Sequence, residues 1–228
     1  MVEKHIRAPI MRQWWQRWLA SLTPGVRGLL LFLTAVYVAS LIGGLTKAFD
    51  LHAWLGLSGP KFWGGQIWRL VSYGWLPTGI LDFLMNSFAL YLLGGILERH
   101  WSRAQLWTYC IFVAAGAGLV KVALQYSNPQ PLTGAMPMMF GLLIAWGFLS
   151  GRESLMMVPF GEMTVWKLVL AAGTVSFLML LLTAGLSTAI IMAAGGLTGW
   201  LYLWIKQKWL MSRAGSIVHS ERINRLEL

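Results

Sequence analysis

The sequence predicts an all-α integral membrane protein with six transmembrane helices, and three observations lead to this prediction. Of the 228 residues, 57% are hydrophobic and only 11% are charged, and the mean hydropathy is +0.62. A soluble domain carries about 25% charged residues, so this chain lacks the polar surface that a soluble fold requires. Long apolar runs alternate with short polar segments, and basic residues concentrate in every second one of those segments.

The apolar runs predict spans at 28–46, 80–97, 104–120 and 134–150, each near the roughly 20 residues that cross the hydrocarbon layer. A further run, 168–205, is too long for one helix. Its small and polar stretch "TAGLST" (183–188) favours a tight turn, so the run predicts the last two spans. The chain therefore divides into an N-terminal segment (1–27), a six-span membrane domain (28–205) and a tail (206–228).

Two segments outside the spans are rich in tryptophan. In "MRQWWQRWLASL", which starts at Met11, apolar and polar residues separate at helical spacing, which predicts an amphipathic helix in the membrane interface. The loop 47–79 is too apolar for a solvated linker and too rich in Gly and Pro for a span. It predicts a semi-embedded loop with one or two short helices. Buried backbone at that depth needs partners within the protein, so Arg69 is expected to donate inside the loop.

The basic residues predict the orientation. All but four of the 18 lysines and arginines fall in segments on one side of the predicted spans; the four exceptions are Lys47, Lys61, Arg69 and Lys121. Cytoplasmic loops carry the excess of Lys and Arg, so both termini are predicted to be cytoplasmic. Topology and attraction to anionic headgroups then account for the net charge of +10, with the lipid bilayer as partner and no nucleic acid. No metal or cofactor site is predicted.

Polar and small residues inside the spans mark three places. Asp82 lies near the start of the second span, with Asn86 four residues later on the same helical face. Asp82 is either a carboxylate that stabilises the helix start or a dedicated binding residue. Gly195, Gly196 and Gly199 on the last span form a stripe that permits close helix contact. The stretch "TGAMPMMFGLL", from Thr133, opens a helix with small residues and a proline suited to the first turn.

In chain order, these segments resemble the rhomboid superfamily of intramembrane serine proteases, over roughly 60–205. The loop "IWRLVSYGWL" (67–76) contains the signature residues Trp68 and Arg69, and "LMNSFALYLLGGILE" (84–98) contains Asn86 and Glu98. "LTGAMPMMFGLL" (132–143) has the frame of the nucleophile motif, from Gly134 to Gly141. "VPFGEMTVWK" (158–167) and "AAGGLTG" (193–199) are similar to the loop before the fifth span and to the last-span motif.

The resemblance implies a serine nucleophile, a last-span histidine base and an oxyanion site, but these positions carry other residues. Met136 stands at the serine position and Ala193 at the histidine position, while Asp82 replaces a second-span histidine. A thioether cannot become an alkoxide, a methyl group cannot accept a proton, and a carboxylate disfavours a developing oxyanion. Only Asn86 is kept. Met136, with Met138 and Met139, is expected to fill the vacated space as flexible apolar bulk.

The glycines and the histidines complete this interpretation. Gly134, Gly141, Gly195, Gly196 and Gly199 are expected to keep the close helix contact that serves the dyad in the family. The four histidines all lie outside the predicted spans, and His52, in the outer loop, has no serine motif near it.

The sequence therefore predicts a pseudoprotease: a protein with the rhomboid architecture and no peptidase activity. The resemblance to derlins and inactive rhomboid proteins implies binding of transmembrane segments of client proteins, at a lateral opening near spans two and five. Two alternatives stay open. One is an active intramembrane peptidase with an unconventional site, including a hydrolase that uses Asp82. The other is a scaffold whose tryptophan-rich segments thin or anchor the bilayer.

Overall fold

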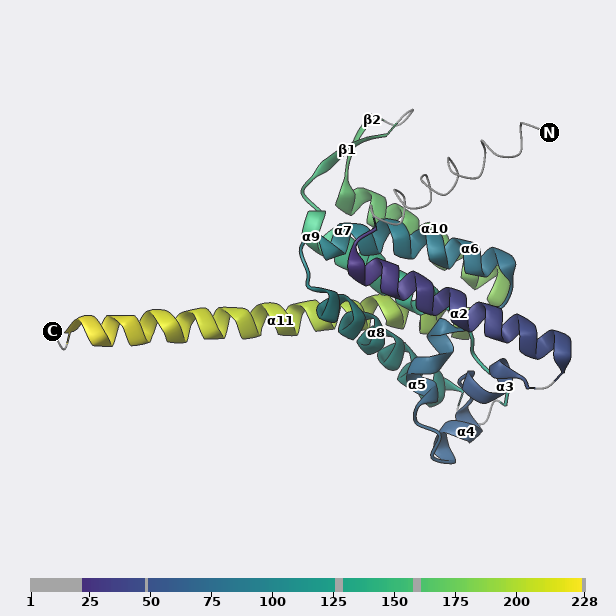
Figure 1. Cartoon of the computed structure of the whole chain (residues 1–228). Helices are drawn as coiled ribbons and strands as arrows, with labels where there is room; N and C mark the ends of the chain where they lie inside the picture. Colours follow the sequence, from purple (N-terminus) through teal and green to yellow (C-terminus); the bar gives the residue numbers. More distant parts are fainter. Residues whose placement is uncertain (1–21, 48, 126–128, 158–160, 227–228) are drawn as a thin grey trace, which may run out of the picture.

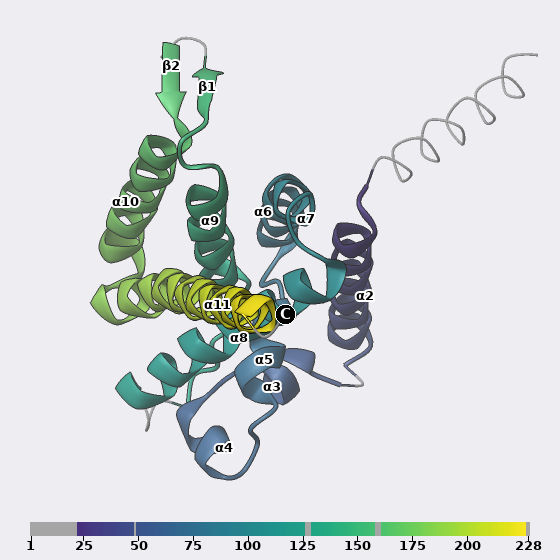
Figure 2. The same cartoon turned by 90° about the vertical axis from the view of Figure 1, so that its left-hand side faces the viewer.

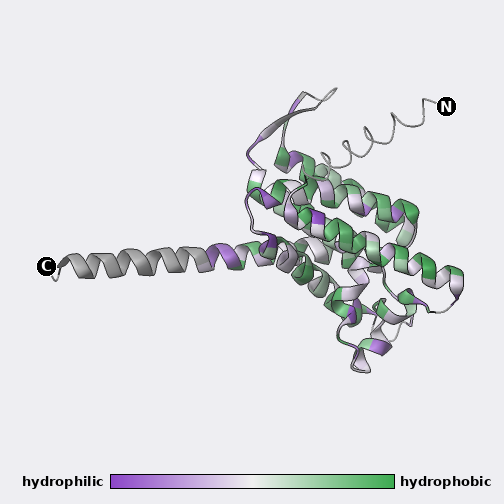
Figure 3. Cartoon of the chain, in the orientation of Figure 1, coloured by the Kyte–Doolittle hydropathy of each residue, from purple (hydrophilic) through white to green (hydrophobic). Residues whose placement is uncertain are grey.

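Figure 1 shows a computed structural model of the chain, which describes residues 22–47, 49–125, 129–157 and 161–226. The predicted interfacial helix that starts at Met11 lies almost wholly outside the described residues. In the described part the fold is helical apart from one short hairpin. Figure 3 shows that hydrophobic residues cover the helices of the bundle, as expected for helices surrounded by lipid.

Five helical stretches are long and apolar enough to span a membrane. They are α2 (Pro24–Thr46), the stretch Ile80–Glu98, α8 (Arg103–Leu124), α10 (Val165–Ala184) and the first part of α11 (Leu186–Leu226). The stretch Ile80–Glu98 is continuous but changes winding: α6 (Ile80–Ala89), a π-helical segment η2 (Leu90–Gly94) and α7 (Gly95–Glu98) follow one another. These five correspond to the predicted spans one, two, three, five and six.

The predicted fourth span is shorter than expected. Helix α9 (Met136–Ser150) has 15 residues, or about 22 Å at 1.5 Å per residue, against a hydrocarbon layer of about 30 Å. It begins two residues late because Gly134, at φ +108°, adopts a left-handed conformation that a helix cannot continue through. The described chain thus has five helices of spanning length and one shorter apolar helix, rather than six full spans.

The break that the sequence predicts in the long apolar run is confirmed. Helix α10 ends at Ala184, and Gly185, at φ +83°, turns the chain into α11. Helix α11 runs on without interruption to Leu226, 41 residues in all, and so includes most of the predicted tail (206–228). Figure 1 shows this helix extending far beyond the bundle.

The segments between the helices contain more structure than the sequence predicted. The loop after α2 holds α3 (Leu51–Leu55), α4 (Gly59–Trp63), α5 (Arg69–Ser72) and a 3-10 turn, η1 (Tyr73–Trp75). Between α9 and α10, β1 (Ser154–Met157) and β2 (Gly161–Thr164) form an antiparallel hairpin that projects from the bundle. The loop helices and the hairpin form through local backbone hydrogen bonds, which a hydropathy pattern does not indicate.

Helices α8, α9 and α11 form the centre of the molecule, whereas α2 and α10 are peripheral. In their most apolar stretches, 50% of the residues of α8 are buried against 11% of those of α10. Figure 2 shows α10, α9, the α6–α7 stretch and α2 side by side in that order. Helix α9 therefore separates α10 from span two, and the family-like positions gather around its start.

Candidate functional site around the start of α9

The start of α9 is tied to the loop and to α8. The Gly134 amide donates to the Tyr73 carbonyl (3.1 Å), and the Tyr73 hydroxyl donates to the Ala114 carbonyl on α8 (2.9 Å). Leu57 and Leu132 exchange two backbone hydrogen bonds of 3.0 and 2.7 Å. The 3-10 turn at Tyr73 therefore fixes where α9 begins, which no sequence pattern indicated.

Arg69 organises this loop, as the sequence predicted. Its side chain is 4% exposed; Nε donates to Gln66 Oε1 (2.6 Å), Nη2 donates to the Ala53 carbonyl (3.0 Å), and Nη1 donates to the Gly56 carbonyl. Burial lowers the pKa of the Arg69 guanidinium, because desolvation disfavours its charged, protonated form. Burial raises the pKa of the Tyr73 phenol, because there the charged form is the deprotonated one. Trp68, its signature neighbour, is 52% exposed.

Asp82 and Asn86 lie beside the start of α9. Asp82 Oδ2 accepts hydrogen bonds from the Thr78 amide (2.9 Å) and hydroxyl (3.2 Å), and Asn86 Nδ2 donates to Asp82 Oδ1 (2.8 Å). A Cβ atom on Gly134 would lie 3.6 Å from Asp82 Oδ2. Of the two interpretations of Asp82, these bonds match a carboxylate that closes the first turn of its own helix.

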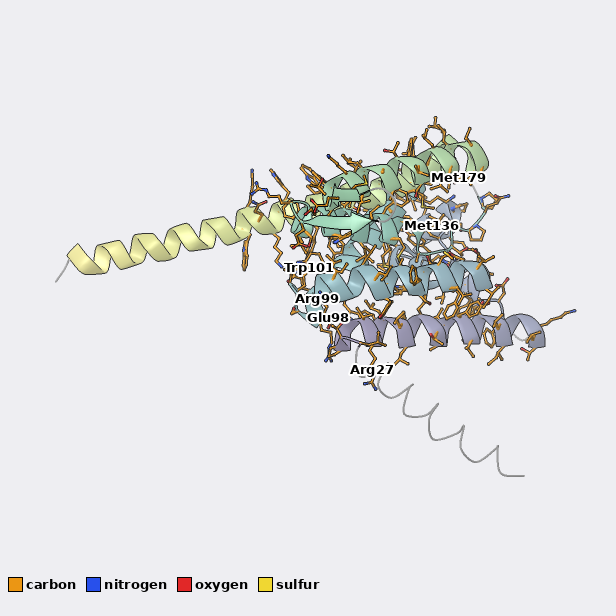
Figure 4. All side chains as sticks on the ribbon, turned by 90° about the horizontal axis from the view of Figure 1, so that it is seen from above. Arg27, Glu98, Arg99, Trp101, Met136 and Met179 are labelled. Atoms are coloured by element: carbon orange, nitrogen blue, oxygen red, sulfur yellow. The ribbon has the colours of Figure 1, made fainter. Side chains whose placement is uncertain are left out.

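Met136 does not fill the vacated space, contrary to expectation. Its side chain is 44% exposed, whereas Met138 is 1% exposed within the core. Met138 shares the core-facing side of α9 with Leu142 and Ala145, four and seven residues later, and Met136 falls outside that helical spacing. In Figure 4, Met136 lies between α10, which carries Met179, and span two.

The last-span glycines bring α11 against α9 at backbone distance. A Cβ atom on Gly195 would lie 2.1 Å from the Pro137 carbonyl oxygen, and one on Gly199 would lie 2.3 Å from Tyr109 Oη. Gly141 on α9 faces this contact, since a Cβ atom there would lie 3.3 Å from the Gly195 carbonyl oxygen, and a Cβ atom on Gly199 would lie 3.1 Å from Gly141 Cα. Gly196 is less confined, with the nearest atom, Ile144 Cγ1, at 3.4 Å.

Ala193 lines an apolar groove between α9, α10 and α11. The groove has a volume of about 640 Å³. Three small residues, Gly173, Ala193 and Gly196, leave the space, and large side chains such as Phe140, Trp166 and Phe177 complete its walls. The groove is therefore apolar and faces the lipid on the α10 side of the molecule. Below we call it the α10 groove.

One pair of residues was missed by sequence reasoning. Ser40 Oγ on α2 lies 2.9 Å from His52 Nε2 on α3, in a small pocket of about 360 Å³ that also holds Lys47 and Asp50. A serine hydroxyl on an imidazole is the first contact of a nucleophile–base pair. Asp50 does not complete a triad with His52. Its carboxylate instead accepts a hydrogen bond from the Ala53 amide at the start of α3 (3.1 Å). As a tether, the contact joins α3 to the end of α2.

Glu98 has a structural contact that its motif position did not reveal. Its carboxylate accepts hydrogen bonds from the Thr23 hydroxyl (2.5 Å) and from the amides of Gly25 (2.6 Å) and Val26 (2.8 Å). Figure 4 shows Glu98 at the same end of the molecule as Arg27 and Arg99. Across the described ranges, no three His, Cys, Asp or Glu side chains come together in the way a metal ion would require.

The long apolar helices and the buried glycine contacts define the chain as a multi-pass integral membrane protein. A family model described as "Eukaryotic integral membrane protein (DUF1751)" matches residues 27–213, and the chain belongs to this family. The chain is also similar to RHOMBOID-like protein 5 of Arabidopsis thaliana, with 29% identity over 79 residues. That match covers 35% of this chain and 26% of the plant protein, so the rhomboid similarity is weak and partial.

Proposed function

We propose that this protein is a rhomboid-like pseudoprotease that lacks peptidase activity and binds transmembrane segments of client membrane proteins. The observation that carries the proposal is the α10 groove: Ala193, at the position of the family's base, lines an apolar space that faces lipid. Met136, at the nucleophile position, is exposed between α10 and span two. Neither side chain can transfer a proton, whereas both can contact an apolar helix.

The packing of α10 supports a lateral binding surface there. Helix α10 is the least buried of the spanning helices, and Leu170, Val175 and Met179 are each at least 60% exposed. Membrane helices associate through close packing at small residues, and Gly173, Ala193 and Gly196 provide them along the groove. A client helix could therefore approach α11 closely while packing against α10.

Photocrosslinking tests client binding. A photoreactive residue at Thr174, in the α10 groove, is expected to capture transmembrane segments, whereas one at Val38, which is exposed on α2, is expected not to. A captured segment, resynthesised as a peptide in liposomes, should bind the wild-type protein and lose binding to Gly196→Leu, which fills the groove. Equal capture at both positions, or binding that Gly196→Leu leaves intact, would contradict the proposal.

The Ser40–His52 contact favours a second candidate function, that of a serine hydrolase whose site is the small pocket between the end of α2 and α3. A fluorophosphonate probe separates the two functions, because it labels only an activated serine. We expect no labelling of the wild-type protein. Labelling that disappears in Ser40→Ala and persists in Ser87→Ala would establish the hydrolase and overturn the claim of inactivity. Cleavage of transmembrane substrates that requires Asp82 would overturn it through the other unconventional site.

A further inference from the structure

A second groove runs between α2 and span two, on the far side of the molecule from the α10 groove. It has a volume of about 510 Å³. Its walls are mainly aliphatic and aromatic, with Leu30, Leu31, Phe83, Leu84 and Phe88 among the lining residues. Arg27, an exposed residue in the first turn of α2, is its one cationic lining residue among those described, and none of them is acidic.

The length of this groove and its apolar walls fit one lipid chain. Its residues on span two run from Phe83 to Tyr91, about 12 Å at 1.5 Å per residue, which is within one leaflet of about 15 Å. A flexible acyl chain is narrow enough to lie there.

The charge at the end of the groove selects the headgroup. Arg27 lies at the end where α2 begins, the same end as Glu98 and Arg99 (Figure 4). The Glu98 carboxylate is already held by the Thr23 hydroxyl and two amides of α2, so it is committed to the helix start. The Arg27 guanidinium has no carboxylate among the groove residues and presents five donors that match phosphate oxygens.

We propose that this groove binds an anionic glycerophospholipid, with one acyl chain between α2 and span two and the headgroup phosphate on Arg27. The site depends on neither the α10 groove nor the absence of peptidase activity. It is therefore independent of client binding. A bound lipid at this position fills the space beside the helix start that Glu98 caps.

Native mass spectrometry of the full chain with phosphatidylglycerol or phosphatidylcholine of identical acyl chains tests the site. We expect one phosphatidylglycerol per chain to bind about fivefold more tightly than phosphatidylcholine, the value of one basic residue near a membrane surface. Arg27→Gln should abolish this preference and Arg27→Lys should retain it. Arg99→Gln, which removes an exposed charge at the same end but outside the groove, should leave it unchanged.

Occupancy of the groove is tested separately. Thr34→Phe places bulk in the groove from an exposed position of α2 and should weaken binding of both lipids. Phosphatidylglycerol with a photoreactive acyl chain should crosslink within residues 83–91. Equal loss of preference in Arg27→Gln and Arg99→Gln, or crosslinks on α10 instead of span two, would overturn the proposal in favour of non-specific surface charge.

Discussion

Glu98 ends span two where α2 begins, and its carboxylate binds donors that the first turn of α2 cannot satisfy within the helix. The Gly25 and Val26 amides and the Thr23 hydroxyl all donate to it. A carboxylate at a helix N-terminus also interacts favourably with the helix dipole. Gly25 permits the contact, since a Cβ atom there would lie 2.7 Å from Glu98 Oε1.

Glu98→Gln is expected to destabilise the fold by about 1–2 kcal/mol. The amide keeps the size of the side chain but turns an NH₂ group towards donors, and it loses the charge that strengthens these bonds. The measurement is the Tm of the purified protein in detergent micelles, followed by tryptophan fluorescence. Arg99→Gln, one residue away and exposed, should leave Tm unchanged. An equal fall in both variants would mean that Glu98 has no specific capping role.

Arg69→Lys tests the loop at the level of one side chain. An ammonium group cannot reach Gln66, Ala53 and Gly56 at once, so a buried carbonyl loses its donor at a cost of about 1–3 kcal/mol. The matched control is Lys61→Gln. Lys61 also donates to the Ala53 carbonyl (2.8 Å) but is exposed, so its replacement should lower Tm far less. The comparison fails if the two variants lose equal stability.

At the scale of elements, the contact between α9 and α11 depends on which glycine is replaced. Gly195→Ala would place a methyl group 2.1 Å from the Pro137 carbonyl oxygen, so a backbone must shift. Gly196→Ala would meet only Ile144 Cγ1 at 3.4 Å, an ordinary contact. We expect Gly195→Ala to lose about 3 kcal/mol, the upper part of the usual range for overpacking, and Gly196→Ala to keep wild-type stability. Folded yield and Tm after purification distinguish these outcomes.

Hydropathy and charge were sufficient to predict five of the long helices, because spanning helices must be apolar over a length that the bilayer sets. The turn at Gly185 was predictable because small residues interrupt the last run. The short α9 was not, because its residues are as apolar as those of any span and only the left-handed Gly134 delays its start. Nor were the loop helices and the hairpin, which depend on local pairing rather than on hydropathy.

The candidate site was partly predictable for a similar reason. Helical spacing placed Asp82 and Asn86 on one face, and the rhomboid resemblance implied that this face lies near the motif that contains Gly134; the structure brings the three residues together. The sequence could not show that Met138 rather than Met136 enters the core, since that depends on the rotation of α9. The Ser40–His52 contact was also hidden, because it joins a span to a loop whose fold was unknown.

At the scale of the whole molecule, contacts far apart in the sequence place the start of α2 and the middle of α11 at one end. Glu98 accepts a hydrogen bond from the Gly25 amide (2.6 Å). Trp101 follows Glu98 by three residues, and Lys206 Nζ on α11 lies 5.9 Å from the centre of its ring. The loop helices lie at the other end, where the Tyr73 carbonyl accepts a hydrogen bond from the amide of Gly134, two residues before α9. We therefore expect α9, although it has only 15 residues, to carry the chain from one end to the other.

This arrangement predicts that the start of α2 and the end of the last spanning stretch (Leu186–Trp209) lie on the same side of the membrane. Single cysteines at the exposed positions Pro24, Gln207 and Lys61 test it with a membrane-impermeant maleimide; the native Cys110 is buried within α8. Because basic residues concentrate at the end with Pro24 and Gln207, we expect that side to be cytoplasmic. Lys61→Cys should label in intact cells, and the other two only after permeabilisation.

The pattern of labelling tests two claims separately: how many times the chain crosses the membrane, and which side is cytoplasmic. Labelling of Pro24→Cys and Gln207→Cys from opposite sides would mean that α9 does not carry the chain across, and that only the five long helices span. Labelling of both from outside would keep the even number of crossings and reverse the orientation. The hydrogen bond from the Gly25 amide to Glu98 and the contact of Lys206 with the Trp101 ring fix only relative positions. The first outcome would therefore contradict the packing itself, whereas the second would contradict only the charge argument.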